Sequence, residues 1–151
     1  MPNVCRVKHI LALVDGTESS LRAADLAIDL AIALGARMTA MAIVDTDTLH
    51  QLLSVRILVD AEIGEFEKEL QESARRHLAD VRLRAACREL VIDEVLATGN
   101  SEAIVPKQVE ARGVHLIVVG GFRSSRTTRD LLARQRQQIV DHAACPVLVV
   151  K

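Results

Sequence analysis

Aromatic residues are almost absent from this chain of 151 residues, which has two phenylalanines, Phe66 and Phe122, and neither tryptophan nor tyrosine. Proteins that bind single-stranded nucleic acid stack the bases on aromatic side chains, so this chain lacks the groups for such a platform. A basic excess is missing as well, because the net charge is -1. General nucleic-acid and membrane-surface binders carry a clear positive excess. We therefore expect no nucleic-acid partner and no membrane partner.

Cysteines and long apolar runs are also scarce. Cys5, Cys87 and Cys145 lie far apart, and none belongs to a CxxC pair. This spacing excludes a disulfide framework and a cysteine zinc site, and free thiols are typical of a reducing cytosol. No apolar run reaches the roughly 18 residues of a membrane-spanning helix, and the N-terminus has no signal-peptide core. The sequence predicts a cytoplasmic protein.

The motifs of common catalytic and phosphate-binding sites are missing too. The chain contains no HExxH, GxSxG, GxxxxGK[ST] or GxGxxG. Its five histidines are scattered, and we expect each of them to be structural rather than a general base. Asp45 and Asp47 can touch a ligand but form no metal cluster. We expect no enzyme activity and no metal; slow nucleotide hydrolysis is not excluded and is the weakest hypothesis.

Five short apolar runs alternate with helical patterns along the chain. The runs cover 7–14, 38–44, 90–97, 116–119 and 147–150. Apolar residues recur at helical spacing over 19–34, 61–87, from 100 onward and over 130–142. Continuous apolar runs are typical of strands buried on both faces, as in parallel sheets covered by helices. The alternation predicts an α/β fold: one doubly wound, Rossmann-like domain over 1–151 with a five-stranded parallel sheet.

The polarity of the third run predicts the strand order. This run contains Asp93 and Glu94 and is the most polar of the five, so we place it at an edge of the sheet. The order 3-2-1-4-5 follows, with the first and fourth strands central. Ligands of such sheets bind outside the carboxyl ends of the strands at the topological switch point. We therefore expect a ligand crevice between the ends of the first and fourth strands.

Two segments fit this pattern less well. Pro106 lies too deep for the first turn of the third helix, so we expect that helix to be kinked or to begin later. The stretch 46–60 has scattered apolar residues and is predicted to be a short helix or a lid.

The turns after the first and fourth strands carry the candidate site residues. Asp15 and Gly16 follow the first strand. The carboxylate can accept hydrogen bonds from an adenine amine or a ribose hydroxyl, or instead from the backbone at the start of the next helix. Gly120 and Gly121 follow the fourth strand, where glycines either let a phosphate approach backbone N–H groups or only form a turn.

Arginines dominate the segment after these glycines. The chain has 15 arginines and 4 lysines, and five of the arginines, including Arg123 and Arg134, lie between positions 123 and 136 beside a single acid, Asp130. Such a patch can bind phosphate or sulfate through charge-assisted hydrogen bonds. A solvated face, or pairing with acids across a dimer, produces the same pattern, and the sequence leaves these alternatives open.

Several of these segments together resemble the universal stress protein family. The resemblance lies in 10–20 with the alanines that follow, in the turn 98–101, in the strand 116–120 and in the ending 142–150. It covers nearly the whole chain in the right order. It implies a stress-response protein that forms a homodimer through the last strand, Val147–Val150. The lack of a catalytic set favours a non-enzymatic protein that acts through contacts with protein partners, which the sequence does not identify. An apolar edge strand with unpaired backbone groups independently favours such pairing.

One motif of that family is degenerate here. Nucleotide-binding members carry G-x2-G-x9-G-[S/T] after the fourth strand; Gly120 matches the first position, whereas Arg123, Ala133 and Arg134 replace the other three. A side chain at a glycine position crowds the backbone approach that phosphates need. The stretch 132–135 is closer to the branch typified by universal stress protein A, which is regarded as not binding ATP. The resemblance therefore implies no cofactor.

The alternative hypothesis is a sensor module that binds ATP, AMP or another anion. In this interpretation Asp15 contacts the base or ribose and Gly16 lets the backbone turn tightly beside it, while Gly120 and Gly121 let the ligand approach the backbone. The arginines of the segment 123–136, Arg123 and Arg134 among them, would then supply the phosphate contacts in place of the donors that the lost glycines provided.

Overall fold

The computed structural model describes residues 6–47, 50, 60–121 and 129–151; the side chains of 60, 61, 63 and 129–135 lie outside the description. Strands and helices alternate in this part of the chain. They are β1 (His9–Leu13), α1 (Glu18–Leu34), β2 (Arg37–Val44), α3 (Asp60–Ala86), β3 (Asp93–Thr98), α4 (Ser101–Arg112), β4 (Leu116–Gly120), α5 (Arg129–His142) and β5 (Val147–Val150). Most of the segment 46–60, predicted to be a helix or lid, falls outside the described residues.

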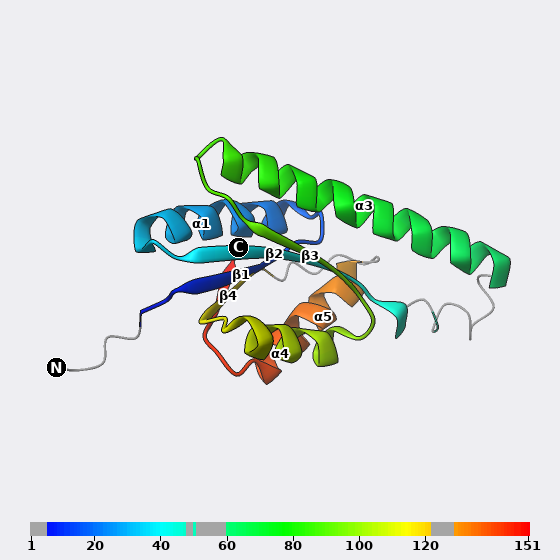
Figure 1. The fold of residues 1–151 in the computed structure, drawn as a ribbon. Coiled ribbons are helices and arrows are strands. Elements are labelled where there is room, and N and C mark those ends of the chain that lie inside the picture. Colours follow the sequence, from blue (N-terminus) through cyan, green and yellow to red (C-terminus); the bar gives the residue numbers. More distant parts are fainter. Residues whose placement is uncertain (1–5, 48–49, 51–59, 122–128) are drawn as a thin grey trace.

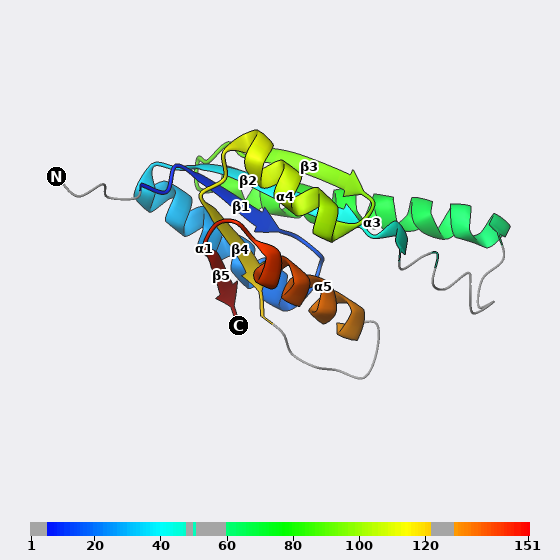
Figure 2. The same cartoon turned by 90° about the horizontal axis from the view of Figure 1, so that it is seen from below.

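The strands form a five-stranded parallel sheet in the order β3-β2-β1-β4-β5, which confirms the predicted topology. The central strand β1 lies between β2 and β4, with Leu11 opposite Thr39 on one side and Ile117 on the other. The carboxyl ends of β1 and β4 are therefore adjacent (Figure 2). This is the switch point at which open α/β sheets bind their ligands.

Helices cover both faces of the sheet. Helices α1 and α3 lie on one face, and α4 and α5 lie on the other (Figure 1). Ile10, Leu11 and Ala12 of β1 are fully buried between the two layers. Burial of such apolar side chains is the main driving force for folding, and it explains why the central strands appear in the sequence as mainly apolar runs.

The ends of α1 and α4 follow from their capping residues. Thr17 caps α1, where its side chain accepts a hydrogen bond from the N–H of Ser20, and Asn100 caps α4 in the same way. Of the two alternatives for α4, the later start was wrong, because this cap starts the helix at Ser101 and leaves Pro106 inside it; the kink stays a prediction. Proline within a helix removes one backbone hydrogen bond, and the cap and the packing of α4 outweigh that loss.

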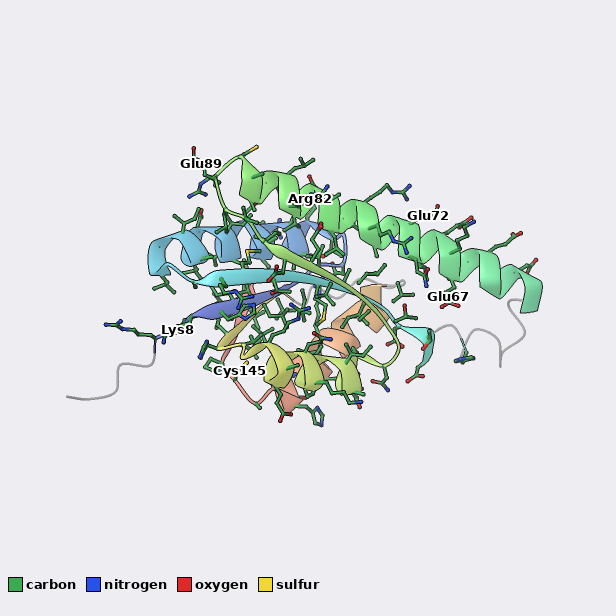
Figure 3. The ribbon with its side chains drawn as sticks, viewed as in Figure 1. Lys8, Glu67, Glu72, Arg82, Glu89 and Cys145 are labelled. Atoms are coloured by element: carbon green, nitrogen blue, oxygen red, sulfur yellow. The ribbon has the colours of Figure 1, made fainter. Side chains whose placement is uncertain are left out.

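The part of α3 from Leu70 onward packs against the core on this face of the sheet. Ala74, Leu78, Val81 and Ala85 are buried there, whereas Phe66 in the first half is 36% exposed. The first half extends past the end of the sheet, so it has no strand to cover (Figures 1 and 3). The predicted apolar stripe is therefore confirmed for the second half of the helix. The described residues of the first half are mostly exposed.

The two edges of the sheet differ in polarity. At the β3 edge, Asp93 and Glu94 form ion pairs with Arg37 and Arg82. This confirms the polar third strand as an edge strand, where charges discourage pairing with another sheet. At the opposite edge, β5 consists of four apolar residues, and its Val149 is 36% exposed. The β5 edge therefore lacks the charged protection of the β3 edge.

Candidate ligand crevice between β1 and β4

The turn between β1 and α1 is held by the side chain of Asp15. Its Oδ1 atom accepts hydrogen bonds from the Thr17 backbone N–H at 3.0 Å and from the Thr17 hydroxyl at 2.7 Å. A short polar side chain that bonds the backbone two residues ahead is the usual way in which aspartate forms a turn. The turn-forming alternative considered for Asp15 is therefore confirmed for one of its two carboxylate oxygens.

Gly16 is fixed by its conformation and by a neighbour from α3. Its φ of 82° lies in the left-handed region, which side-chain-bearing residues rarely adopt. A Cβ atom at this position would lie 2.3 Å from Nε2 of His77, whose ring covers the turn. The same Nε2 atom is 3.2 Å from the hydroxyl of Ser73. The open side of Gly16 thus faces protein rather than a ligand.

The glycines after β4 also make room for the protein itself. A Cβ atom on Gly120 would lie 2.8 Å from backbone atoms of Ser19 and Ser20, at the start of α1. A Cβ atom on Gly121 would lie 3.0 Å from the Cα of Lys151. Gly120 therefore lets α1 pack directly on the end of β4. The missing side chain of Gly120 leaves space that the start of α1 fills.

Arg136 from α5 occupies the crevice. It is 7% exposed, and its guanidinium lies among groups from the turn between β1 and α1, from the first turn of α1 and from the end of β4. Nε donates to Oδ2 of Asp15 at 2.9 Å, and Nη2 donates to the same oxygen and, at 2.7 Å, to the Thr17 hydroxyl. Nη1 donates to the Gly121 carbonyl at 2.7 Å and to the Ser19 hydroxyl at 3.2 Å. A guanidinium has five N–H donors, so all of them have a protein acceptor.

The carboxylate of Asp15 likewise has a hydrogen-bond donor at each of its acceptor positions. Oδ1 accepts two hydrogen bonds from Thr17, and Oδ2 accepts two from Arg136. An ionised carboxylate offers about four acceptor positions, and here each of them has a donor. No acceptor position of Asp15 is left for an adenine amine or a ribose hydroxyl.

Backbone donors at the crevice are used within the chain as well. The N–H of Asp15 donates to the Ser20 hydroxyl at 3.0 Å, and the N–H of Ser20 donates to the Thr17 hydroxyl at 3.2 Å. The N–H of Thr17 donates to Asp15, and the N–H of Gly121 donates to the Val150 carbonyl at 2.6 Å. Phosphate cradles depend on backbone N–H groups that point at the ligand. These four point at protein acceptors instead.

The remaining predicted site residues divide into two groups. Arg123 lies outside the described residues, and only the backbone of Arg134 is described, within α5. Asp47 accepts a hydrogen bond from Nδ2 of Asn100 at 2.7 Å, and its own N–H donates to Asp45. These contacts tie the end of β2 to the cap of α4. Within the described residues, no group of three or more histidine, cysteine, aspartate or glutamate side chains could hold a metal ion.

Arg136 is the residue that sequence reasoning missed. It was counted in the arginine-rich segment, with Arg134 proposed for the site instead. One signal was present, since Arg136 lies three residues before Ile139, which is buried, and residues at that spacing share a helix face. An arginine on the sheet-facing side of a helix needs a buried acceptor, and Asp15 provides it.

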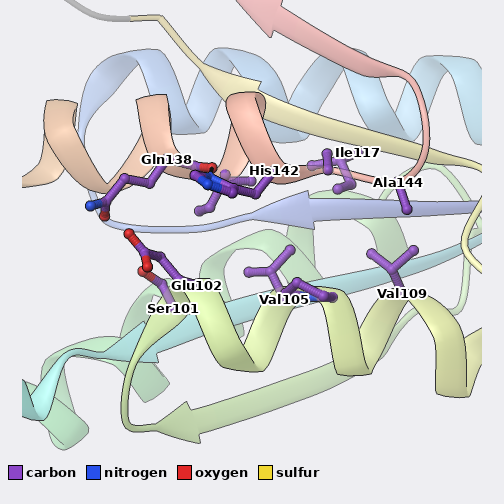
Figure 4. Close-up of a pocket in the computed structure, with 11 residues that line it drawn as sticks. Ser101, Glu102, Val105, Val109, Ile117, Gln138, His142 and Ala144 are labelled. Atoms are coloured by element: carbon purple, nitrogen blue, oxygen red, sulfur yellow. Dashed lines mark hydrogen bonds between the residues drawn. The ribbon is translucent and has the colours of Figure 1, made fainter.

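An open groove between α4 and α5 is separate from this crevice. Its floor is apolar, with Val105, Val109 and Ile117, and Glu102 and His142 lie at its rim (Figure 4). None of the predicted site residues lines the groove. It therefore contributes nothing to the candidate site.

Comparison with known proteins agrees with this architecture. The family model described as "Universal stress protein family" matches residues 6–151. This chain belongs to the universal stress protein family. A putative universal stress protein of Staphylococcus haemolyticus is 30% identical over 145 residues, which cover 95% of this chain and 84% of the relative.

Solved structures of universal stress proteins share the fold. The protein from Lactobacillus plantarum has a TM-score of 0.78 at 21% identity and covers 97% of this chain and 99% of its own. A family protein of Arabidopsis thaliana, described with AMP bound, has a TM-score of 0.63 at 13% identity and covers 95% of this chain and 91% of its own. At these identities the likeness supports the fold alone. None of the described helices is long and apolar enough to cross a membrane.

Proposed function

We propose that this universal stress protein does not bind ATP in the crevice between β1 and β4, and that it acts without catalysis, through protein contacts, as a cytoplasmic homodimer. The main support for the proposal is that the carboxylate of Asp15 has no free acceptor position. Its carboxylate already accepts hydrogen bonds from Thr17 and Arg136 at both oxygens. A nucleotide would have to displace one of these donors before it could bind.

The electrostatics of the buried ion pair oppose the displacement of Arg136 by a nucleotide. The Arg136 and Asp15 side chains are only 8% and 22% exposed, so their charges are largely removed from water. Separating a buried pair leaves an uncompensated charge, which costs more than the pair's net contribution to stability. A triphosphate that displaced Arg136 would also face the negative carboxylate of Asp15. Both effects disfavour an anionic ligand in the crevice.

The shape of the site opposes a phosphate as well. The N-terminal turn of α1 packs within van der Waals distance of Gly120, the first glycine of the family motif. The sequence places Arg123, Ala133 and Arg134 at the other three motif positions. The loss of the motif glycines and the internal use of nearby backbone N–H groups support the same conclusion.

A nucleotide sensor is the second candidate. One observation favours it, namely that the AMP-bound Arabidopsis protein has the same fold. In such a sensor Arg136 would move away from Asp15, and Arg123 and Arg134 would contact phosphate. In the described structure, every N–H donor of Arg136 and every acceptor position of Asp15 already has a partner within the chain. We therefore rank this function second.

Equilibrium dialysis of the wild-type chain against ATP, and separately against AMP, tests the proposal. We expect no saturable binding below about millimolar nucleotide, which corresponds to less than roughly 4 kcal/mol of binding free energy. A nucleotide-binding member of the family serves as the positive control. Micromolar binding that disappears in an Asp15→Ala variant would establish the sensor function instead. Ligand binding at a hundredfold excess over Kd would also stabilise the fold by about 2.7 kcal/mol in a thermal-shift measurement.

The homodimer is proposed through the edge strand β5. The strand is apolar along its whole length, and an unprotected edge of this kind pairs readily with another strand. The opposite edge, β3, carries the exposed acids Asp93 and Glu94, which discourage pairing. This asymmetry supports β5 as the contact between two copies.

A further inference from the structure

We propose that the crevice between β1 and β4 is a guanidinium-binding site, which Arg136 fills from within the same chain. The inference rests on the proposed function, in which this crevice takes no nucleotide. It adds the chemical class of group that the site does accept. It also assigns Arg136 the role of an internal ligand rather than that of an unspecific surface charge.

The groups that face the guanidinium are hydrogen-bond acceptors. They are the Oδ2 atom of Asp15, the hydroxyl oxygens of Thr17 and Ser19, and the carbonyl oxygen of Gly121. The Thr17 hydroxyl donates its own hydrogen to Oδ1 of Asp15, so towards Arg136 it can only accept. A guanidinium has donors and no acceptor, and therefore it complements this set of groups.

The acceptors also match the planar shape of a guanidinium. The edge formed by Nε and Nη2 faces the carboxylate of Asp15, whereas Nη1 faces the end of β4 at the Gly121 carbonyl. Acceptors along two edges of one planar group favour the rigid fork of donors of a guanidinium. An ammonium is instead a point charge with three donors. The geometry therefore selects guanidinium over both lysine-like cations and anions.

The site is part of the protein interior rather than a surface contact. Arg136 is 7% exposed, and its acceptors come from the turn between β1 and α1, from the first turn of α1 and from the residue after β4. Because these elements are fixed by the buried core, the acceptors keep their positions when the side chain is shortened. A variant that lacks the guanidinium should then bind a free alkylguanidinium of the same shape.

Chemical rescue of Arg136→Ala by ethylguanidinium chloride tests the proposal. Loss of the buried pair should lower the Tm of this variant by about 6 to 12 °C. Millimolar ethylguanidinium, far below denaturing concentrations, should raise the Tm in a saturable manner and should bind in calorimetry with one site per chain. The wild-type chain, whose site is filled, should show neither effect.

Three controls identify the ligand class. Ethylammonium chloride and inorganic phosphate should not rescue Arg136→Ala, and ethylguanidinium should not rescue the double variant Asp15→Asn/Arg136→Ala. Rescue by phosphate, or no rescue by ethylguanidinium, would overturn the assignment. Micromolar binding of AMP by Arg136→Ala would also overturn it, yet would leave the proposed absence of nucleotide binding in the wild type intact. Nucleotide binding by the wild type would instead contradict the proposed function itself.

A second pair of variants covers the case in which Arg136→Ala does not fold. Arg136→Lys keeps a cation in the acceptor site, and Arg136→Met keeps a similar length without charge. We expect the wild type to have the highest Tm, Arg136→Lys an intermediate one and Arg136→Met the lowest, because a lysine can still donate hydrogen bonds to the buried carboxylate of Asp15, whereas a methionine cannot. A methionine substitution as stable as the lysine substitution would overturn the assignment.

Discussion

The Nε atom of Arg136 lies 2.9 Å from Oδ2 of Asp15, although the two residues are 121 positions apart in the chain. This contact joins α5 to the carboxyl end of β1. Through the Gly121 carbonyl, the same guanidinium reaches the end of β4. The crevice at the switch point of the sheet is therefore closed by a side chain of the protein.

Removal of the carboxylate should destabilise the fold strongly. We expect Asp15→Ala to lower the free energy of unfolding by about 3 kcal/mol, because Arg136 would remain buried without its counterion. Asp25→Ala is the matched control, since Asp25 pairs with Arg84 at 2.9 Å but is half exposed. Exposed pairs contribute less than about 1 kcal/mol. Urea titration measures both values, and equal losses would contradict the structural role assigned to Asp15.

The turn at Gly16 should resist substitution more than an unobstructed glycine does. Gly35 has a similar left-handed φ of 62°, but nothing lies near its missing side chain, whereas a Cβ on Gly16 meets the ring of His77. Gly35→Ala should cost about 1 kcal/mol from backbone strain alone, and Gly16→Ala should cost about 1 kcal/mol more.

The additional cost at Gly16 can be assigned to His77 by a double-mutant cycle. In a His77→Ala background, Gly16→Ala should cost about as much as Gly35→Ala, because only backbone strain remains. If the cost of Gly16→Ala were the same with and without the imidazole, the contact between this ring and the turn would not be the cause.

His9 is a buried histidine at the amino end of β1, away from the crevice. Its Nε2 atom is 2.7 Å from the Thr39 hydroxyl, and its Nδ1 atom is 2.9 Å from the Arg112 carbonyl. Burial removes the ring from water and lowers its pKa below the usual value of 6.5. The imidazole is therefore held in its neutral form.

This shift makes stability depend on pH in a defined direction. Because the folded pKa of His9 lies below the unfolded value, the unfolded chain binds the proton more readily. The contribution of His9 is complete above about pH 6.5 and is lost as the pH falls below that value. In His9→Gln, which keeps polar groups but does not titrate, the decline in unfolding free energy between about pH 6.5 and about pH 5 should be smaller. A decline as steep as that of the wild type would exclude His9 as its source.

The proposed dimer makes a prediction about β5. Val149→Lys places a charge on the exposed side of this edge strand, and we expect the variant to be monomeric in light scattering. Leu83→Lys is the matched control, because Leu83 is a 60% exposed apolar residue on α3. This control should keep the wild-type mass. A dimer that persists in Val149→Lys, or a wild-type monomer, would contradict the interface.

Much of the fold could be predicted from consecutive residues. Mainly apolar runs identified the strands, and the acids of the third run placed it at an edge, as the order β3-β2-β1-β4-β5 confirms. The α3 helix shows where such reasoning ends. Its apolar spacing continues through Phe66, which is nevertheless 36% exposed, because burial also requires a partner surface and the first half of α3 extends past the end of the sheet.

The sequence predicted where the candidate site lies, but not which groups of the protein fill it. Asp15 and Gly120 lie at the predicted switch point because their positions follow from the strand ends. Their partners do not follow in the same way. The space beside Gly120 is taken by α1, and the carboxylate of Asp15 is taken by Arg136.

The sequence alone determined the elements, the order of the strands and the location of the crevice, because periodicity and polarity are properties of neighbouring residues. The tertiary structure decided that the crevice is filled by a guanidinium. That outcome depends on which face of α5 packs on the sheet and on how close it comes to the end of β1. Hydrogen bonds act over about 3 Å, so a pair 121 residues apart is decided only when the layers have assembled.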